Sequence, residues 1–351
     1  MSRRRTFNLA VLPGDGIGPE VIAEGIKALR AAERHMPACH FALSEYPAGA
    51  GAYLHGGDPL PAPTLAACKR ADAILLGAMG LPDVRWPDGR EMTPQIDLRD
   101  RLDLYAGIRP LVLFHPAHSP LKGLTTLDLT IVRENCEGLF WSRNTIPAAD
   151  ASFVEDTLHI SRVGAERICR MAFALARQRR RHITLVDKAN VLPSMVFLRQ
   201  VFDQVAPSFP EVTTDRVYVD AMALYLVQDP ARFDVVVTEN LFGDILSDLG
   251  AGLVGGLGMA PSADIGDRHA VFQPVHGTAP GIAGQGIANP VATILSVAML
   301  LEWLDLEETH VAAQHIRAAV ASTLADPRQW TADLGGTRTT SALGDFIAAQ
   351  I

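Results

Sequence analysis

Short apolar runs alternate along the chain with segments that carry the 3.6-residue spacing of amphipathic helices. The apolar runs that predict strands are residues 7–12, 73–76, 127–132, 183–186 and 234–237. The helical spacing covers residues 19–32, 161–177, 193–205 and 289–304. Strands that alternate with helices predict an α/β architecture with largely parallel sheets.

The chain contains no internal repeat and no low-complexity linker, so any domain boundary must be a crossover within the fold. Proline-rich turns at residues 109–110 and 116–120 predict that the chain leaves one sheet there. The glycine-rich stretch at residues 250–258 is a candidate for the return. With 351 residues, 48% of them hydrophobic, the chain is long enough for two domains that each bury a core.

Charge and composition exclude several classes of function. A net charge of −8 argues against a nucleic-acid partner. The longest apolar run, residues 291–301, is too short to span a membrane, and no apolar signal region follows the N-terminal basic residues. The 4 cysteines show no metal-ligand spacing and predict reduced thiols. We therefore expect a cytoplasmic protein with no membrane partner.

The first strand runs into the glycine-containing loop Pro13-Gly14-Asp15-Gly16-Ile17-Gly18-Pro19-Glu20. This loop is similar to a dinucleotide-binding fingerprint, but its third glycine comes one residue too early and Pro19 follows it. No acidic residue stands at the usual distance for a ribose hydroxyl. A tight strand-to-helix turn, with Pro19 at the helix start, explains the loop better. A cofactor must then be held elsewhere.

Residues 240–248 (NLFGDILSD) follow a predicted strand and have the pattern of a helix start. Asp244 and Asp248 stand four residues apart, so both carboxylates project from one face of that helix. Two like charges at this spacing repel each other, whereas Mg²⁺ or Mn²⁺ would bind both. The alternative is two solvated acids near a helix N-terminus, where the helix dipole favours them.

Other polar residues follow predicted strands. Arg109 is followed by Pro110, and Arg133 ends a predicted strand, where a guanidinium can bind a carboxylate with paired hydrogen bonds; Arg99 is a third candidate. Taken singly, an arginine is more often a surface ion-pair partner. The remaining candidates are Lys188 and Asn190 after one strand, Asp220 after the extended run 217–219, and the small-residue loop His276-Gly277-Thr278-Ala279-Pro280.

Taken together, these motifs resemble the β-decarboxylating dehydrogenases that act on 3-isopropylmalate, isocitrate, homoisocitrate or tartrate. The resemblance covers essentially the whole chain and is closest to the 3-isopropylmalate type. The motifs that carry it, in family order, are LPGDGIGPE, DLYAGIRP, VREN, DKANVL, YVDAMA, NLFGDILSD, HGTAP and GIANP.

The resemblance implies a two-domain α/β fold that is not a Rossmann fold, with the active site in the cleft between the domains. The large cofactor-binding domain would comprise residues 1–104 and 256–351. Residues 105–255 would form a small domain that carries the metal ligands and the interface of a homodimer.

The resemblance also implies a role for each candidate residue in the oxidative decarboxylation of a hydroxy-diacid. Mg²⁺ or Mn²⁺ would be bound by Asp244, Asp248 and the Asp220 of a second subunit. Lys188, the proton acceptor, and Asn190 would cross from that subunit as well. The substrate-binding residues would be Arg99, Arg109 and Arg133, with Thr93 and Gln95 facing the third substituent. The adenosine half of NAD would contact His276, Gly277, Thr278, Ala279, Gly281, Ile282 and Asn289.

Three positions depart from the family pattern. Phe140 replaces a tyrosine thought to help protonate the product, and Gln273 replaces a glutamate near the nicotinamide, which removes one negative charge there. Gly281 stands where NAD-linked members carry an aspartate and NADP-linked members often a lysine. Ile282 matches the NAD-linked members, so we expect NAD, with NADP not excluded.

The substrate is left open among several acids. A buried Gln95 opposite an isopropyl group would lack a hydrogen-bond partner, which favours a substituent with a polar end. Isocitrate, homoisocitrate and tartrate are therefore alternatives to a 3-isopropylmalate-type substrate. A further alternative is a non-catalytic regulatory subunit of the same fold.

Overall fold

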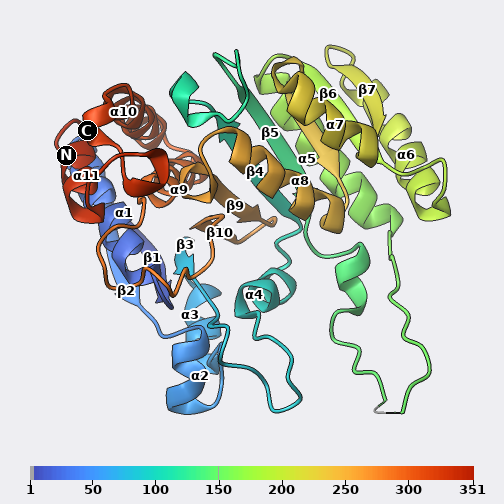
Figure 1. Ribbon diagram of the computed structural model, residues 1–351, viewed down its shortest axis with the longest axis horizontal. Coiled ribbons are helices and arrows are strands. Elements are labelled where there is room, and N and C mark those ends of the chain that lie inside the picture. Colours follow the sequence, from blue (N-terminus) through green and yellow to red (C-terminus); the bar gives the residue numbers. More distant parts are fainter. Residues whose placement is uncertain (1–3, 149) are drawn as a thin grey trace.

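The computed structural model describes residues 4–148 and 150–351 and has the predicted α/β architecture (Figure 1). In the described part of the chain, one ten-stranded sheet has the order β2-β1-β3-β10-β9-β4-β5-β8-β6-β7. The strands are β1 (Arg5–Gly14), β2 (Cys39–Glu45), β3 (Ala73–Ala78), β4 (Ala106–Val112), β5 (Asp128–Glu134), β6 (His182–Asp187), β7 (Thr213–Tyr218), β8 (Val235–Thr238), β9 (Pro261–Ile265) and β10 (Ala270–Pro274).

All five predicted strands are present, as β1, β3, β5, β6 and β8. The expectation that the chain leaves one sheet for another near residue 110 is wrong. Pro110 lies inside β4, and this strand pairs with β9 on one side and with β5 on the other. Both pairings are antiparallel, as is the pairing of β9 with β10, so β9 and β4 together join the two parallel parts of a single continuous sheet. Pro110 therefore does not end the strand in which it lies.

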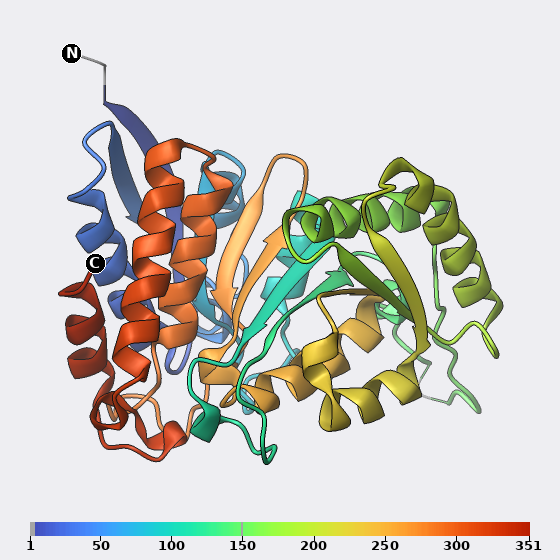
Figure 2. The same cartoon turned by 90° about the horizontal axis from the view of Figure 1, so that it is seen from above.

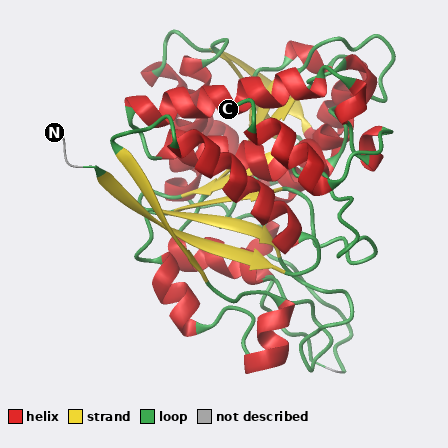
Figure 3. Cartoon of the chain, turned by 90° about the vertical axis from the view of Figure 1, so that its left-hand side faces the viewer, coloured by secondary structure: helices red, strands yellow, loops and turns green. Residues whose placement is uncertain are grey.

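Helices cover both faces of the sheet (Figures 1, 2 and 3). The four predicted helices are α1, α5, α6 and α9. The full set in the described residues is α1 (Gly18–Glu33), α2 (Ala50–Gly56), α3 (Ala62–Cys68), α4 (Pro94–Leu102), α5 (Arg162–Gln178), α6 (Pro193–Val205), α7 (Val219–Gln228), α8 (Asn240–Leu253), α9 (Val291–Trp303), α10 (Glu307–Leu324) and α11 (Thr340–Ala348).

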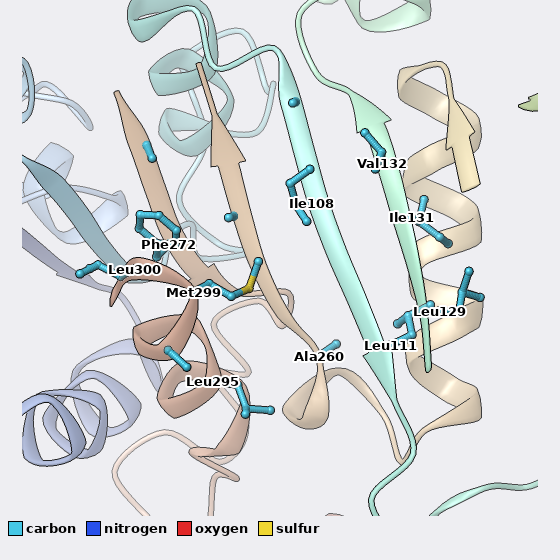
Figure 4. Close-up of a cluster of buried hydrophobic side chains, with 14 of the residues drawn as sticks. Ile108, Leu111, Leu129, Ile131, Val132, Ala260, Phe272, Leu295, Met299 and Leu300 are labelled. Carbon is cyan, nitrogen blue, oxygen red and sulfur yellow. The ribbon is translucent and has the colours of Figure 1, made fainter. Parts of the chain in front are cut away.

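The main hydrophobic core extends across the junction between the two parts of the sheet. Figure 4 shows side chains of this cluster from several elements, with Ile108 of β4, Ile131 of β5 and Phe272 of β10 among them. Leu295 and Leu300 of α9 belong to the same cluster. Because the core crosses the junction, burial of apolar surface holds the two halves of the chain together.

The loop after β1 is a structural turn, as the sequence predicted. Gly14 and Gly16 have positive φ angles of 75° and 58°. A Cβ at Gly14 would lie 1.9 Å from the carbonyl oxygen of Ala78, and one at Gly16 would lie 2.0 Å from that of Thr278. The Asp15 carboxylate accepts hydrogen bonds from the backbone of Ala50, Gly51 and Gly80. The glycines therefore allow close contact with protein backbone.

Within the described residues, no helix combines the length and the apolar character that crossing a bilayer requires.

Candidate active site

A cavity of about 330 Å³ lies against the middle of the sheet, and both halves of the chain line it. Its volume is in the range of small-molecule sites. Residues of β3, α4, β4, β5, α8 and β10 line it, together with residues of the loops that follow some of these elements. Besides the imidazole of His276, its ionisable lining side chains are Arg99, Arg109, Arg133, Asp244 and Asp248. The three arginines and two aspartates singled out from the sequence are thus brought into one cavity.

The register of the central strands explains this convergence. Gly107 of β4 pairs with Arg133 of β5 and with Asp264 of β9. Directly paired residues on neighbouring strands point to the same face of a sheet, and so do residues two apart on one strand. Arg109, Arg133 and Asp264 therefore share one face, and Arg99 on α4 reaches them there.

Asp264 is the main residue of this site that the sequence analysis missed. Its side chain is 1% exposed and contacts the Nε of Arg99 at 3.0 Å and a terminal nitrogen of Arg109 at 2.9 Å. Asn135 and Gln273 donate their side-chain amides to the same carboxylate, at 2.9 and 2.7 Å. Burial alone would raise the pKa of Asp264, but the two arginines outweigh burial and hold the pKa well below its usual range. The signal for this residue was a charge inside a short apolar strand, since such charges are buried only when they are paired.

Arg133 is held by a second set of contacts, on α8. The side-chain oxygen of Asn240 accepts from its Nε at 3.0 Å and from one terminal nitrogen at 2.7 Å. The other terminal nitrogen pairs with Asp244. Burial and the nearby Arg99 lower the pKa of Arg133 to about 10. Asn240, like Asp264, was not identified as a site residue from the sequence.

Asp244 and Asp248 project from α8 into the cavity, one helical turn apart, as the sequence predicted. Desolvation and the neighbouring Asp244 carboxylate raise the pKa of Asp248. Carboxylate oxygens are suitable ligands for a hard divalent cation. Among the described residues, however, no group of three or more acidic, histidine or cysteine side chains is arranged to hold a metal ion. One chain alone supplies two of the three predicted metal ligands.

Lys188, Asn190 and Asp220 do not line this cavity. Lys188 follows β6, and Asp220 lies in the first turn of α7. The Lys188 Nζ donates to a carboxylate oxygen of Asp220 at 2.5 Å, and this hydrogen bond lowers the pKa of Asp220. Asn190 and Asp220 are exposed. This second group of predicted residues is therefore separate from the cavity within a single chain.

The sequence matches the family model described as isocitrate/isopropylmalate dehydrogenase over residues 8–347. The chain belongs to the isocitrate/isopropylmalate dehydrogenase family. It is similar to the 3-isopropylmalate dehydrogenase of Moorella thermoacetica, with 45% identity over 91% of each chain. The 3-isopropylmalate dehydrogenase of Streptomyces coelicolor is 44% identical over 99% of each chain.

Solved structures give the same family. Isocitrate dehydrogenase from Methylococcus capsulatus superposes with a TM-score of 0.88 and 35% identity, over 98% of this chain and 99% of that one. A β-decarboxylating dehydrogenase from Thermococcus kodakarensis gives 0.82 and 38%, over 98% and 96%. The protein is therefore a β-decarboxylating dehydrogenase with the fold of this family, and its cavity is the candidate active site. This result also favours an enzyme over the non-catalytic subunit considered above.

The predicted cofactor residues of this dehydrogenase fall into two groups. His276 and Gly277 line the cavity, whereas Thr278, Ala279, Gly281, Ile282 and Asn289 do not. Thr278 is 7% exposed, and its carbonyl oxygen accepts from the backbone of Ile17. The Asn289 side chain donates to Asp333 at 3.0 Å and accepts from the backbone of Val291. Burial lowers the pKa of His276, so its imidazole is neutral at pH 7.

The residues predicted to face the third substituent are also divided. Gln95 lines the cavity, and its side-chain oxygen is buried without a hydrogen-bond partner among the described residues. Thr93 immediately precedes α4 and lines a neighbouring hollow instead. Phe140 lines the cavity, with its ring 5.2 Å from the Arg133 guanidinium. A hydrophobic ring thus stands beside the predicted substrate-binding arginine.

Proposed function

We propose that this protein carries out the metal-dependent, NAD-linked oxidative decarboxylation of a 2-hydroxy acid with a β-carboxylate, of the 3-isopropylmalate type. The observation that carries the proposal is the cavity in which three arginines stand beside the Asp244–Asp248 pair. A substituted malate presents two carboxylates and a hydroxyl group. Arginines are suited to the carboxylates, and a metal held by the aspartates is suited to the hydroxyl.

The arginines bind and orient the acid in this proposal. Arg99 contacts Asp264 through Nε, and Arg133 is fixed by Asn240, so neither guanidinium has to be ordered when the substrate binds. Guanidinium groups that are already ordered lose less entropy on binding. We infer that Arg99, Arg109 and Arg133 hold the two carboxylates of the substrate.

Asp244 and Asp248 fit a divalent cation, because both are carboxylates that point into the cavity and repel each other without one. Asp220 of the partner subunit would complete the set. When bound, Mg²⁺ or Mn²⁺ would lower the pKa of the substrate hydroxyl and polarise the ketone that replaces it.

Lys188 of the partner subunit, or a water molecule that it holds, accepts the hydroxyl proton as the hydroxyl carbon is oxidised. The carbon–carbon bond to the β-carboxylate then breaks, and CO₂ leaves. The electron pair of that bond forms the double bond of an enolate, whose negative charge lies on the former ketone oxygen. The resulting enolate takes a proton at carbon. Phe140 has no proton to give, so Lys188 or water supplies it.

The loop from His276 to Pro280, with Gly281, Ile282 and Asn289, is where we place the adenosine half of the cofactor. NAD supplies the hydride acceptor when it is bound. The neutral imidazole of His276 and the exposed backbone of Gly277 suit close approach of a ligand to this loop. Gly281 carries no group that would repel a 2′-phosphate, so NADP is a second candidate.

Isocitrate is a second candidate substrate, with homoisocitrate and tartrate after it. The buried side-chain amide of Gln95 favours a substituent with a polar end, which an isopropyl group lacks. The structure from Methylococcus capsulatus bears the name isocitrate dehydrogenase.

The proposal is tested with the purified protein, Mn²⁺, NAD or NADP, and each of the four acids. We expect NADH and CO₂ to form in equal amounts with at least one acid, and EDTA to abolish both. Reduction of the cofactor without release of CO₂, or activity that survives EDTA, would contradict the proposed chemistry.

A further inference from the structure

Asp264 is placed to control the charge of the active site without touching the substrate. It is not part of the cavity lining but lies directly behind it, in contact with Arg99 and Arg109. Both arginine residues are themselves buried, at 6% and 4% exposure. A buried carboxylate at this distance offsets much of the positive charge that two buried arginines would otherwise present to an anion.

The carboxylate of Asp264 also explains why position 273 carries a glutamine. Gln273 lines the cavity from β10, and its amide nitrogen donates to Asp264 at 2.7 Å. A glutamate here, the usual residue in the family, would bring two carboxylates into contact in a buried site. Such a pair could not remain fully ionised. The negative charge expected at position 273 is therefore present one strand away, on β9, where it contacts the arginines.

Asp264 changes the net charge that the site presents to a substrate. Three arginines and two aspartates line it, which leaves one net positive charge, and Asp264 brings the site to neutrality before any metal binds. A tricarboxylate carries one more negative charge than a dicarboxylate. Each negative charge on a ligand is repelled by Asp264, so the tricarboxylate is disfavoured more.

We propose that Asp264 is a specificity-determining positioning residue, which orients Arg99 and Arg109 and selects dicarboxylate substrates over tricarboxylates. The inference deepens the proposed function, since it rests on that function for the choice of acids. It predicts that the third substituent of the substrate is uncharged. A polar but neutral substituent remains compatible with the unpartnered oxygen of Gln95.

The test compares the two acids in the intact protein. Dissociation constants for 3-isopropylmalate and isocitrate are measured by calorimetry with Mn²⁺ present, for the wild type and for Asp264→Asn. We expect the wild type to favour 3-isopropylmalate and the variant to shift the ratio of the two constants towards isocitrate by about tenfold. The ratio of kcat/KM values should shift in the same direction. A folding defect lowers the active fraction for both acids and leaves the ratios unchanged.

The double variant Asp264→Asn/Gln273→Glu is the matched control. It keeps the altered contacts of Arg99 and Arg109 but restores one negative charge to the site. We expect its ratio to return most of the way to that of the wild type. Asp264→Ser removes the same charge with a smaller side chain, and it serves in place of Asp264→Asn if that variant does not fold.

The outcomes separate the two proposals. An unchanged ratio in both neutral variants, or a double variant that behaves like Asp264→Asn, would overturn the role of Asp264 and leave the proposed function intact. The absence of NADH and CO₂ with every acid would overturn the proposed function. The binding ratio would still decide the role of Asp264 in that case, and failure of the wild type to bind either acid would overturn it.

Discussion

Phe140 and Gly281 are the two residues at which this protein departs most directly from the chemistry of the family pattern. Phe140 places a ring without a hydroxyl beside Arg133, at the edge of the cavity. Gly281 leaves open space, since a Cβ built there meets no atom within 4 Å. Position 281 therefore has room for the aspartate of NAD-linked members, and Phe140 faces the cavity, so substitution tests each role directly.

Replacing Phe140 with tyrosine should restore a proton donor next to the product. We expect Phe140→Tyr to raise kcat by about tenfold or more if protonation of the enolate limits turnover. Steady-state rates of NADH formation and CO₂ release measure this. Phe140→Leu is the control, because it changes the packing without adding a hydroxyl. Equal rates in the tyrosine variant and the wild type would show that a proton donor at position 140 does not control the rate of turnover.

Replacing Gly281 with aspartate should increase the preference for NAD. A carboxylate there would accept hydrogen bonds from the ribose hydroxyls and repel a 2′-phosphate. We expect the ratio of kcat/KM for NAD to that for NADP to rise by about tenfold in Gly281→Asp. Gly281→Asn, which is nearly the same shape but neutral, should change the ratio much less. The assignment of this loop to the adenosine half is wrong if both variants leave the ratio unchanged.

At the scale of elements, α8 organises the site. It carries Asn240, which fixes Arg133, and the Asp244–Asp248 pair. Its N-terminus is capped by Glu239, which is 2% exposed and accepts from the backbone nitrogens of Leu241 and Phe242 at 3.1 and 2.7 Å. This cap positions the first turn of α8, where the contact with Arg133 is made.

Removal of the cap should destabilise the protein and weaken metal binding together. We expect Glu239→Ala to lower the free energy of unfolding by about 2 kcal/mol, because two backbone donors are left without partners in a buried place. Urea denaturation measures this, and calorimetry with Mn²⁺ follows the metal. Glu239→Gln retains one acceptor oxygen and should lose less. If Glu239→Gln lowers the free energy of unfolding as much as Glu239→Ala does, the negative charge of Glu239 and not its capping hydrogen bonds stabilises the protein.

At the scale of the whole molecule, the arrangement of one chain divides the predicted site into two groups. Arg99, Arg109, Arg133 and the two aspartates of α8 meet in the cavity, whereas Lys188, Asn190 and Asp220 lie outside it. The homodimer with shared sites, and the division into domains at residues 105 and 255, remain proposals. With those bounds, the junction of the two domains would lie at the pairing of β4 with β9. Any closure of the cleft would have to bend the sheet there.

A mixture of two inactive variants tests whether the sites are shared. Lys188→Ala keeps the cavity and loses the proton acceptor, and Asp248→Asn does the reverse. If each site combines the two chains, one site in every mixed dimer is intact. We then expect co-expressed chains to recover about one quarter of the wild-type activity, although each variant alone is inactive. No recovery in mixed dimers, purified by two different tags, would place both residues in a site formed by one chain.

The local pattern of the sequence determined much of this protein. The apolar runs and helical spacings predicted five strands and four helices, and Pro19 identified the loop after β1 as a turn. The spacing of Asp244 and Asp248 placed both on one face of a helix. These predictions succeed because each depends on residues within a few turns or strand lengths of one another.

Only the tertiary structure decided which charges meet. The contacts of Asp264 with Arg99 and Arg109 join positions 165 and 155 residues apart in the chain. They follow from the order of strands β10, β9, β4 and β5 and from their register. A short apolar segment does not specify its neighbours in a sheet, so neither the burial of Asp264 nor the reason for Gln273 could be derived from the sequence.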